Sequence, residues 1–204
     1  MTEAFNGSSI DGSLYTEVVG LAHRSPGWFD DLVSTWSTYG LAVFAVLMAF
    51  GWWRARRVSA EAAVIALAAP VIVLVAFAVD DALKLVVRED RPCQSLRVST
   101  LEACPAPGDW SFPSNHAALA AAAAVALLLV SRRLGAVAVV AACAMAVSRV
   151  WVGAHYPHDV LAGTAVGAAV ALLLGLALRR RPGALTRRLT ATPLRPLLTA
   201  AYRS

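Results

Sequence analysis

The stretch HAALAAAAAVALLLV (residues 116–130) contains one histidine followed by fourteen small or aliphatic residues. Such a run is typical of a helix inside a membrane, because no side chain after the histidine needs water. Its alanines would let neighbouring helices approach closely. Four further apolar stretches accompany it, at residues 35–53, 60–79, 134–150 and 160–178. The sequence therefore predicts an all-α integral membrane protein, a bundle of about five transmembrane helices.

The composition supports the membrane assignment. Of the 204 residues, 58% are hydrophobic and only 15% are charged, whereas about a quarter of the residues in a soluble domain are charged. The net charge of +5 is compatible with a nucleic-acid partner. The basic residues, however, lie in loops beside the apolar stretches, where they set the topology. We therefore expect no nucleic-acid partner.

The distribution of Lys and Arg predicts the orientation. With five spans, twelve of the 18 basic residues fall on one side and six on the other. Because cytoplasmic loops carry the excess, the amino terminus is predicted outside a bacterial plasma membrane and the carboxyl terminus in the cytoplasm.

Three parts of the chain follow from these spans. Residues 1–36 are predicted to be an extracytoplasmic segment with short interfacial helices, after a disordered lead-in over residues 1–12. Residues 37–178 are predicted to form the transmembrane domain, and residues 179–204 a basic cytoplasmic tail. Residues 1–30 lack the pattern of a signal peptide.

Polar residues gather where the apolar stretches end. They are Lys84, Arg91, Ser114, His116, Arg149, His155 and Asp159. With the predicted topology all of them emerge on the extracytoplasmic face. A charge at a helix centre in a membrane costs about 2.5–3.5 kcal/mol, so such residues indicate function.

These residue types suit the transfer of a phosphoryl group. Lys84, Arg91 and Arg149 supply fixed positive charge for the phosphate oxygens. Ser114, at the start of a helix, adds a hydroxyl beside backbone N–H groups that point at the anion. His155 and Asp159 are four residues apart, so the carboxylate can accept from one ring nitrogen while the other attacks phosphorus.

His116 remains as the general acid that protonates the leaving oxygen. This reading needs no metal and no cofactor. A zinc site built from the two histidines and Asp159 is the main alternative, although three nearby cations would repel a divalent ion. Lys84 pairing with Asp80, with Asp81 as a further support, is the structural alternative.

The remaining histidines and the cysteines receive other roles. His23 and His158 are expected to be structural or solvated. Cys93 and Cys104 bracket ten residues on the outer, oxidising side, which makes a disulfide that closes a flap beside the site plausible. Cys143 lies in the middle of a span and is expected to be buried.

The polar clusters resemble the three-part signature of the type 2 phosphatidic acid phosphatase superfamily. The matching motifs are Lys84-x6-Arg91-Pro92, Pro113-Ser114-x-His116 and Ser148-Arg149-x5-His155-x3-Asp159. The resemblance implies a metal-independent lipid phosphatase with a phosphohistidine intermediate. In that scheme His155 is the nucleophile, Asp159 its partner and His116 the acid. The phosphate would be held by Lys84, Arg91, Ser114, Asn115 and Arg149, where Asn115 replaces the glycine most common in the superfamily.

Three longer stretches are similar to one branch, the bacitracin-resistance undecaprenyl-diphosphatases. They are GLAH (20–23), SFPSNH (111–116) and SRVWVGAHYP (148–157). The similarity implies hydrolysis of undecaprenyl diphosphate to the monophosphate on the outer face, which recycles the cell-wall lipid carrier. His158 falls at a variable position of this pattern, where it can tune the site.

Several alternatives stay open at this point. Phosphatidic acid, phosphatidylglycerol phosphate and a decaprenyl-phosphoryl sugar phosphate are the nearest rival substrates, and a lipid phosphotransferase would differ only in its acceptor. A haloperoxidase is disfavoured because those enzymes are generally large and soluble. A transporter is disfavoured because the polar residues cluster at one face. The expected partner is a lipid phosphate, and a homodimer is possible.

Overall fold

A computed structural model describes residues 5–180, 182–193 and 195–199. Helices account for all the regular structure of these residues, apart from one isolated bridge between Phe5 and Glu89. The helices are α1 (Ser8–Ala22), α2 (Gly27–Tyr39), α3 (Leu41–Ala55), α4 (Ala60–Val87), α5 (Pro92–Ser95), α6 (Asn115–Val130), α7 (Arg132–Trp151), α8 (Pro157–Arg180), α9 (Pro182–Thr190) and α10 (Arg195–Leu198). The predicted all-α fold is confirmed.

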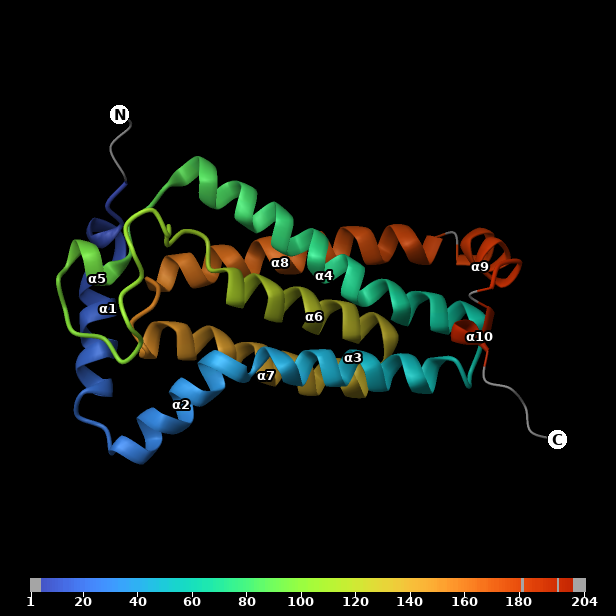
Figure 1. Ribbon diagram of the computed structural model, residues 1–204, viewed down its shortest axis with the longest axis horizontal. Coiled ribbons are helices and arrows are strands. Elements are labelled where there is room, and N and C mark those ends of the chain that lie inside the picture. Colours follow the sequence, from blue (N-terminus) through green and yellow to red (C-terminus); the bar gives the residue numbers. More distant parts are fainter. Residues whose placement is uncertain (1–4, 181, 194, 200–204) are drawn as a thin grey trace.

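Helices α3, α4, α6, α7 and α8 run lengthwise as a bundle (Figure 1). Helix α1 crosses one end of it beside α5, and α9 and α10 lie at the other end. Three helices, α4, α7 and α8, are long and apolar enough to cross a membrane. The bent pair of α2 and α3 makes a fourth candidate, and α6 is apolar but shorter, with 16 residues. The predicted membrane character is confirmed.

The first predicted span, residues 35–53, is not one straight helix. The chain bends by 52° between α2 and α3, at Gly40. A Cβ atom at Gly40 would lie 2.9 Å from both the Met145 side chain of α7 and the Trp36 ring. Glycine therefore permits the bend together with close packing on α7, which hydropathy alone does not reveal.

The predicted disordered lead-in is wrong for residues 5–12. The Phe5 backbone pairs with residues 88–90, donating to Arg88 O at 3.1 Å and accepting from Asp90 N at 3.0 Å. Helix α1 begins at Ser8. Farther along α1, Tyr15 is fully buried and donates its hydroxyl to Gly153 O at 2.9 Å. Tertiary contacts with the end of the bundle order this segment.

Helix α6 forms the centre of the bundle, packed against α8, α7 and α4. All of its alanines are buried. On α8, a Cβ atom at Gly163 would collide with Ser114 O, and one at Gly167 would collide with Ala118 O. These two glycines let the helices touch backbone to backbone, which fixes the start of α6 against the start of α8.

The carboxyl-terminal helices pack on the far end of the bundle. Leu198 of α10 is buried beside Ala63 and Val64 of α4, and Trp52 Nε1 donates to Leu197 O at 2.8 Å. Residues 181, 194 and 200–204 of the predicted tail lie outside the described residues. The predicted domain boundaries after residues 36 and 178 stay predictions. Helix α2 runs through residue 36 and α8 through residue 178.

Two single residues inside the spans lie in settings that hydropathy does not reveal. A proline removes one backbone hydrogen bond from a helix, yet Pro70 lies within the continuous helix α4, so the helix accommodates it. Cys143 is exposed on α7 and not buried. It lines an apolar cavity of about 590 Å³ between α2 and α7. The middle of a span is interior only on the face that packs against other helices, and Cys143 lies on the outward face.

Candidate active site

The predicted site residues lie on helix ends and turns that meet at one end of the bundle, where α1 and α5 also lie (Figure 1). Lys84 lies in the last turn of α4, and Arg91 follows in the connection to α5. Residues 114–116 begin α6. Arg149 lies in the last turn of α7, and the turn between α7 and α8 carries His155. Asp159 lies in the first turn of α8.

The His155 ring has different neighbours at its two nitrogens. Its Nδ1 lies 3.5 Å from Asp159 Oδ2 and 3.4 Å from Ser111 Oγ. Its Nε2 lies 3.0 Å from Arg91 Nη1. When Nδ1 carries the proton and donates to Asp159, the lone pair of Nε2 points to the guanidinium that would hold a phosphate. This is the geometry of an oriented nucleophile.

The surroundings also keep His155 neutral. The ring is 2% exposed. Burial holds the pKa of His155 well below its usual value, and the positive charges of Arg91, Arg149 and Lys84 lower it further. An unprotonated nitrogen is the form that can attack phosphorus, so the cations that would bind the substrate also keep the nucleophile ready.

Asp159 is held by contacts that the sequence motifs did not single out. Its carboxylate is fully buried, and Oδ2 accepts from Ser111 Oγ at 2.5 Å and from the Tyr156 backbone N–H at 2.8 Å. Ser111 therefore contacts both Asp159 and His155. Its only signal in the sequence was its place in the stretch SFPSNH, which was noted for resemblance and not for chemistry.

The start of α6 offers polar atoms that the described residues leave without a partner. The Ser114 backbone N–H donates to Asp159 O at 3.0 Å. The buried Ser114 Oγ has no hydrogen-bond partner, and neither have Asn115 Oδ1 and Arg149 Nε. Since buried polar groups are normally paired, the Ser114 hydroxyl and the Arg149 N–H suit an anionic ligand. His116 is the second residue of α6, so it lies at the same end of the bundle as Ser114 and Asn115.

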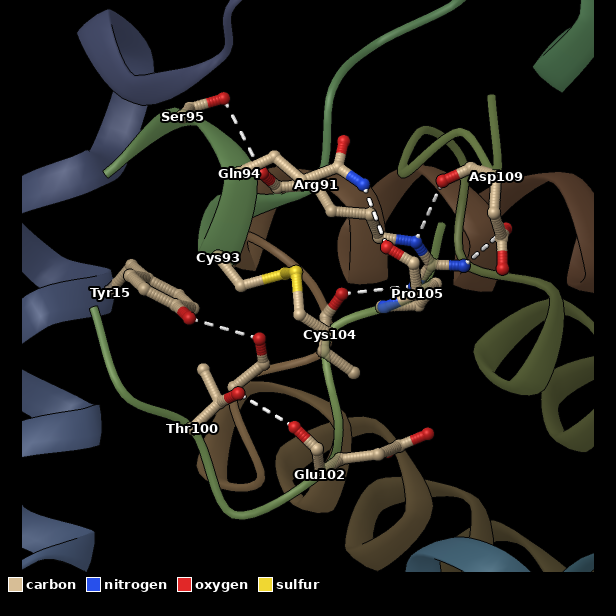
Figure 2. Close-up of a disulfide and its surroundings, with 12 residues drawn as sticks. Tyr15, Arg91, Cys93, Gln94, Ser95, Thr100, Glu102, Cys104, Pro105 and Asp109 are labelled. Atoms are coloured by element: carbon tan, nitrogen blue, oxygen red, sulfur yellow. Dashed lines mark hydrogen bonds and ion pairs between the residues drawn. A yellow bond between two sulfur atoms is a disulfide. The ribbon is translucent and has the colours of Figure 1, made fainter. Parts of the chain in front are cut away.

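The loop between α5 and α6 supplies partners to each of the three cations, and Figure 2 shows its contact with Arg91. Arg91 Nη2 lies 2.8 Å from Asp109 Oδ1, and Arg149 Nη1 lies 2.8 Å from Glu102 Oε2. Lys84 Nζ donates to Trp110 O at 2.9 Å. Both carboxylates are about half exposed, and nothing in the sequence pattern pointed to them.

The same loop is internally braced (Figure 2). Cys93 and Cys104 form a disulfide. Gln94 Nε2 donates to Pro105 O at 2.9 Å, and Thr100 Oγ1 donates to Glu102 O at 2.6 Å. The loop is thus a fixed cover next to the two arginines, in agreement with the flap expected from the cysteine spacing.

The structural alternatives have different outcomes. Lys84 donates to Trp110 O, whereas both carboxylate oxygens of the buried Asp80 lack a hydrogen-bond partner. His23 is exposed, with Nε2 3.0 Å from Ser99 O, which fits a structural role. His158 was also expected to be structural or solvated. It lies within hydrogen-bond distance of the carboxylates of Asp11 and Glu89, which agrees with the structural option.

The predicted zinc alternative does not match the geometry. Among the described residues, the ligand atoms that converge within 4.8 Å belong to Glu89, His158 and Asp159. The set proposed from the sequence, His116 with His155 and Asp159, is not such a group.

Comparison with known proteins found relatives along most of the chain. The sequence profile of the PAP2 superfamily matches residues 65–182, a range that contains all three polar clusters. The undecaprenyl-diphosphatase BcrC of Bacillus subtilis is 29% identical over 164 residues, which cover 78% of this chain and 80% of that protein. The decaprenylphosphoryl-5-phosphoribose phosphatase of Mycobacterium tuberculosis is 41% identical over 88 residues, 43% of this chain and 45% of that protein.

A solved structure shares the fold. The crystal structure of a transmembrane PAP2 type phosphatidylglycerolphosphate phosphatase from Bacillus subtilis aligns with a TM-score of 0.61 and 19% sequence identity. The alignment covers 83% of this chain and 86% of that chain. At this identity the similarity shows the architecture alone.

Proposed function

This chain belongs to the PAP2 superfamily, and on that premise we propose that it hydrolyses a polyprenyl diphosphate to the monophosphate at the extracytoplasmic face of a bacterial plasma membrane. Membership indicates a lipid phosphatase, and the resemblance seen in the sequence is confirmed. The choice of undecaprenyl diphosphate as substrate is supported by the relative that aligns over most of the chain, an undecaprenyl-diphosphatase.

The observation that carries the proposal is the asymmetric setting of His155. Nδ1 faces Asp159, and Nε2 faces Arg91 at 3.0 Å. In the proposed first step the Nε2 lone pair attacks the terminal phosphorus while Arg91, Arg149 and Lys84 stabilise the phosphate oxygens. The N–P bond forms, and the bridging P–O bond breaks.

His116 donates and then accepts the proton that the reaction moves. The electron pair of the broken P–O bond goes to the oxygen of the departing lipid monophosphate, which takes a proton from His116. In the second step His116 accepts a proton from water as the water oxygen attacks phosphorus. The N–P bond then breaks, its electron pair returns to Nε2 of His155, and inorganic phosphate leaves.

The extracytoplasmic location of the site rests on two independent features. The excess of Lys and Arg belongs to the opposite end of the spans, which the positive-inside rule places in the cytoplasm. The disulfide between Cys93 and Cys104 lies at the site end, and disulfides persist in oxidising compartments.

A second substrate class has a specific observation in its favour. The matched part of the Mycobacterium tuberculosis relative is more similar to this chain, at 41% identity over 88 residues, and that protein is a decaprenylphosphoryl-5-phosphoribose phosphatase. A decaprenyl-phosphoryl sugar phosphate is therefore the second candidate. It would use the same phosphate site with a monoester in place of the anhydride.

The test is phosphate release by detergent-purified protein in the presence of EDTA. Undecaprenyl diphosphate is compared with a polyprenyl-phosphoryl sugar phosphate, phosphatidylglycerol phosphate and phosphatidic acid, each with wild type and His155→Ala. We expect release that survives chelation, is fastest with the diphosphate and disappears in the variant. Activity that EDTA abolishes, or that His155→Ala retains, would contradict the mechanism. A faster reaction with the sugar phosphate would decide for the second substrate.

A further inference from the structure

The carboxylate of Asp159 lies between two imidazoles. Its Oδ2 atom faces Nδ1 of His155 at 3.5 Å. Its Oδ1 atom accepts no hydrogen bond and lies 3.4 Å from Nε2 of His158. Because His155 is the proposed nucleophile, His158 is the cationic group best placed to act on its partner carboxylate from the other side.

Both ring nitrogens of His158 are close to carboxylates. Nδ1 lies 2.8 Å from Asp11 Oδ1, and Nε2 lies 3.0 Å from Glu89 Oε1. The backbone N–H of His158 also donates to Asp11 Oδ2 at 2.7 Å. A neutral imidazole donates from one nitrogen only, whereas ionised carboxylates only accept. The contacts with Asp11 and Glu89 are both hydrogen bonds when the ring is an imidazolium, which carries a proton on each nitrogen.

Aromatic packing fixes the orientation of the His158 ring. The ring stacks on Tyr156, with centroids 5.4 Å apart and planes inclined by 17°. It also stacks on Phe112, with centroids 6.0 Å apart and planes inclined by 28°. The imidazole therefore has little freedom to turn away from Asp159.

The amino-terminal segment closes this cluster. A Cβ atom at Gly7 would collide with Glu89 Oε1 and would lie 2.9 Å from His158 Cε1. Glu89 is 1% exposed. The carboxylates of Asp11, Glu89 and Asp159 thus meet one imidazole in a place with little water, where like charges repel strongly unless a cation compensates them.

We propose that His158 is a positioning residue for the phosphatase reaction, and that its imidazolium keeps Asp159 ionised and turned toward His155. The inference rests on the proposed function, in which His155 acquires positive charge when the N–P bond forms. An ionised Asp159 stabilises that charge. His158 touches neither the substrate nor the reacting atoms, and it acts through Asp159 alone.

The experiment compares wild type with His158→Gln in the pH dependence of kcat and KM for undecaprenyl diphosphate. Glutamine keeps an N–H donor and removes the charge. We expect kcat to fall about tenfold at neutral pH and KM to stay within about twofold. The acid limb of the kcat profile should move to higher pH by about one unit, since a nearby cation is worth that much to a carboxylate. The groups that face the ring and enter this titration are Asp11, Glu89, Asp159 and Tyr156.

Two further variants make the result specific. His23→Gln changes a histidine whose ring forms its hydrogen bonds with Ser99 among the described residues, and its profile should match wild type. Asp11→Asn weakens the hold on the imidazolium without touching Asp159, so it should shift the acid limb in the same direction by a smaller amount. Because Asp11 is partly exposed, this variant is expected to fold even where His158→Gln does not.

The outcomes separate the inference from the function on which it rests. Wild-type profiles for both His158→Gln and Asp11→Asn would overturn the role of His158. The role is equally overturned when His158→Gln only lowers the melting temperature and the folded fraction keeps the wild-type acid limb. Loss of the proposed function looks different, because wild type would then release no phosphate or His155→Ala would stay active.

Discussion

The chemistry of the candidate site is decided by a few atoms around His155. One nitrogen faces Asp159 and Ser111, and the other faces Arg91. The carboxylate selects the tautomer, and the guanidinium marks the place of the phosphate. The same guanidinium repels a proton from Nε2, so substrate binding and nucleophile activation use one charge.

The lowered pKa of His155 predicts the protonation state of its ring in the free enzyme. An unperturbed histidine has a pKa of about 6.5, and burial with three nearby cations places that of His155 well below its usual value. The His155 ring is therefore in its neutral, nucleophilic form at pH 6.5 and above. This neutral form is lost only as the pH falls further. We expect the His155 ring of the free wild-type enzyme, followed by the NMR signals of its imidazole in detergent, to titrate with a midpoint below pH 6.5. A midpoint at or above 6.5 would contradict this account of His155.

His116 as general acid predicts a dependence on the leaving group. With a lipid diphosphate, His116→Ala should lower kcat by about 10²–10⁴-fold, the usual contribution of a positioned acid. With an aryl phosphate such as p-nitrophenyl phosphate the loss should be much smaller, because nitrophenolate leaves without a proton. His23→Ala serves as the control. Equal losses on both substrates would show that His116 binds or positions and does not protonate.

The sequence predicted the residues of the three motifs and missed the loop residues that form hydrogen bonds or ion pairs with other groups of the site. Lys84, Arg91, Arg149 and His155 stand out because charges beside apolar spans are rare. Ser111, Glu89 and Glu102 lie in loops where polar residues are ordinary, so no pattern indicates their chemistry. Their importance arises from contacts across the chain, such as Ser111 with Asp159, which are 48 positions apart.

At the level of elements, the contact between α6 and α8 positions the site. The glycines on α8 bring its backbone against that of α6 near Ser114 and Ala118. Gly167→Leu should therefore force the helices apart and destabilise the protein by about 1–3 kcal/mol, as overpacking does. Thermal unfolding in detergent measures this. The matched control is Gly27→Leu, since a Cβ atom at Gly27 would meet nothing within 4 Å. Equal melting temperatures for the two variants would refute the close packing of these helices.

The disulfide loop predicts an effect on substrate binding. Glu102 occupies Arg149 with its carboxylate, so an incoming phosphate must compete with it. Because the Glu102 carboxylate is 43% exposed, we take the contribution of a surface ion pair for this contact, about 0.2–1 kcal/mol. Glu102→Gln should therefore lower KM by up to about fivefold and leave kcat unchanged. Glu61→Gln, at the other end of α4, is the control. An increase in KM would mean that Glu102 orients Arg149 for the substrate and does not compete with it.

Hydropathy predicted the long helices well. It did not predict the order of residues 5–12 or the bend between α2 and α3. Helices α4, α7 and α8 coincide with apolar stretches, because lipid requires continuous hydrogen-bonded helix. The bend at Gly40 and the order of residues 5–12 depend on packing against α7 and on pairing with residues 88–90. Neither cause leaves a periodic signal in the sequence.

At the scale of the whole molecule, the candidate site and the excess of Lys and Arg lie at opposite ends of the bundle. The site, α1 and the disulfide loop occupy one end, and α9 and α10 occupy the other (Figure 1). A long bundle with this polarity suits a lipid substrate whose charged head must reach the first turns of α6 and α8 while its chain stays in the bilayer.

This polarity predicts the orientation in the membrane, with the disulfide loop outside the cell. The test uses Cys143→Ser, which leaves Cys93 and Cys104 as the only cysteines of the chain. A membrane-impermeant thiol reagent applied to intact cells should label this protein only after mild reduction, because Cys93 and Cys104 are then freed on the outer side. A fluorescent protein fused after residue 204 should fluoresce, as it does in the cytoplasm. Labelling that requires lysed cells would place the site in the cytoplasm. The enzyme would then act on lipid phosphates of the inner leaflet, and the carrier-recycling role would be lost even where the phosphatase chemistry held.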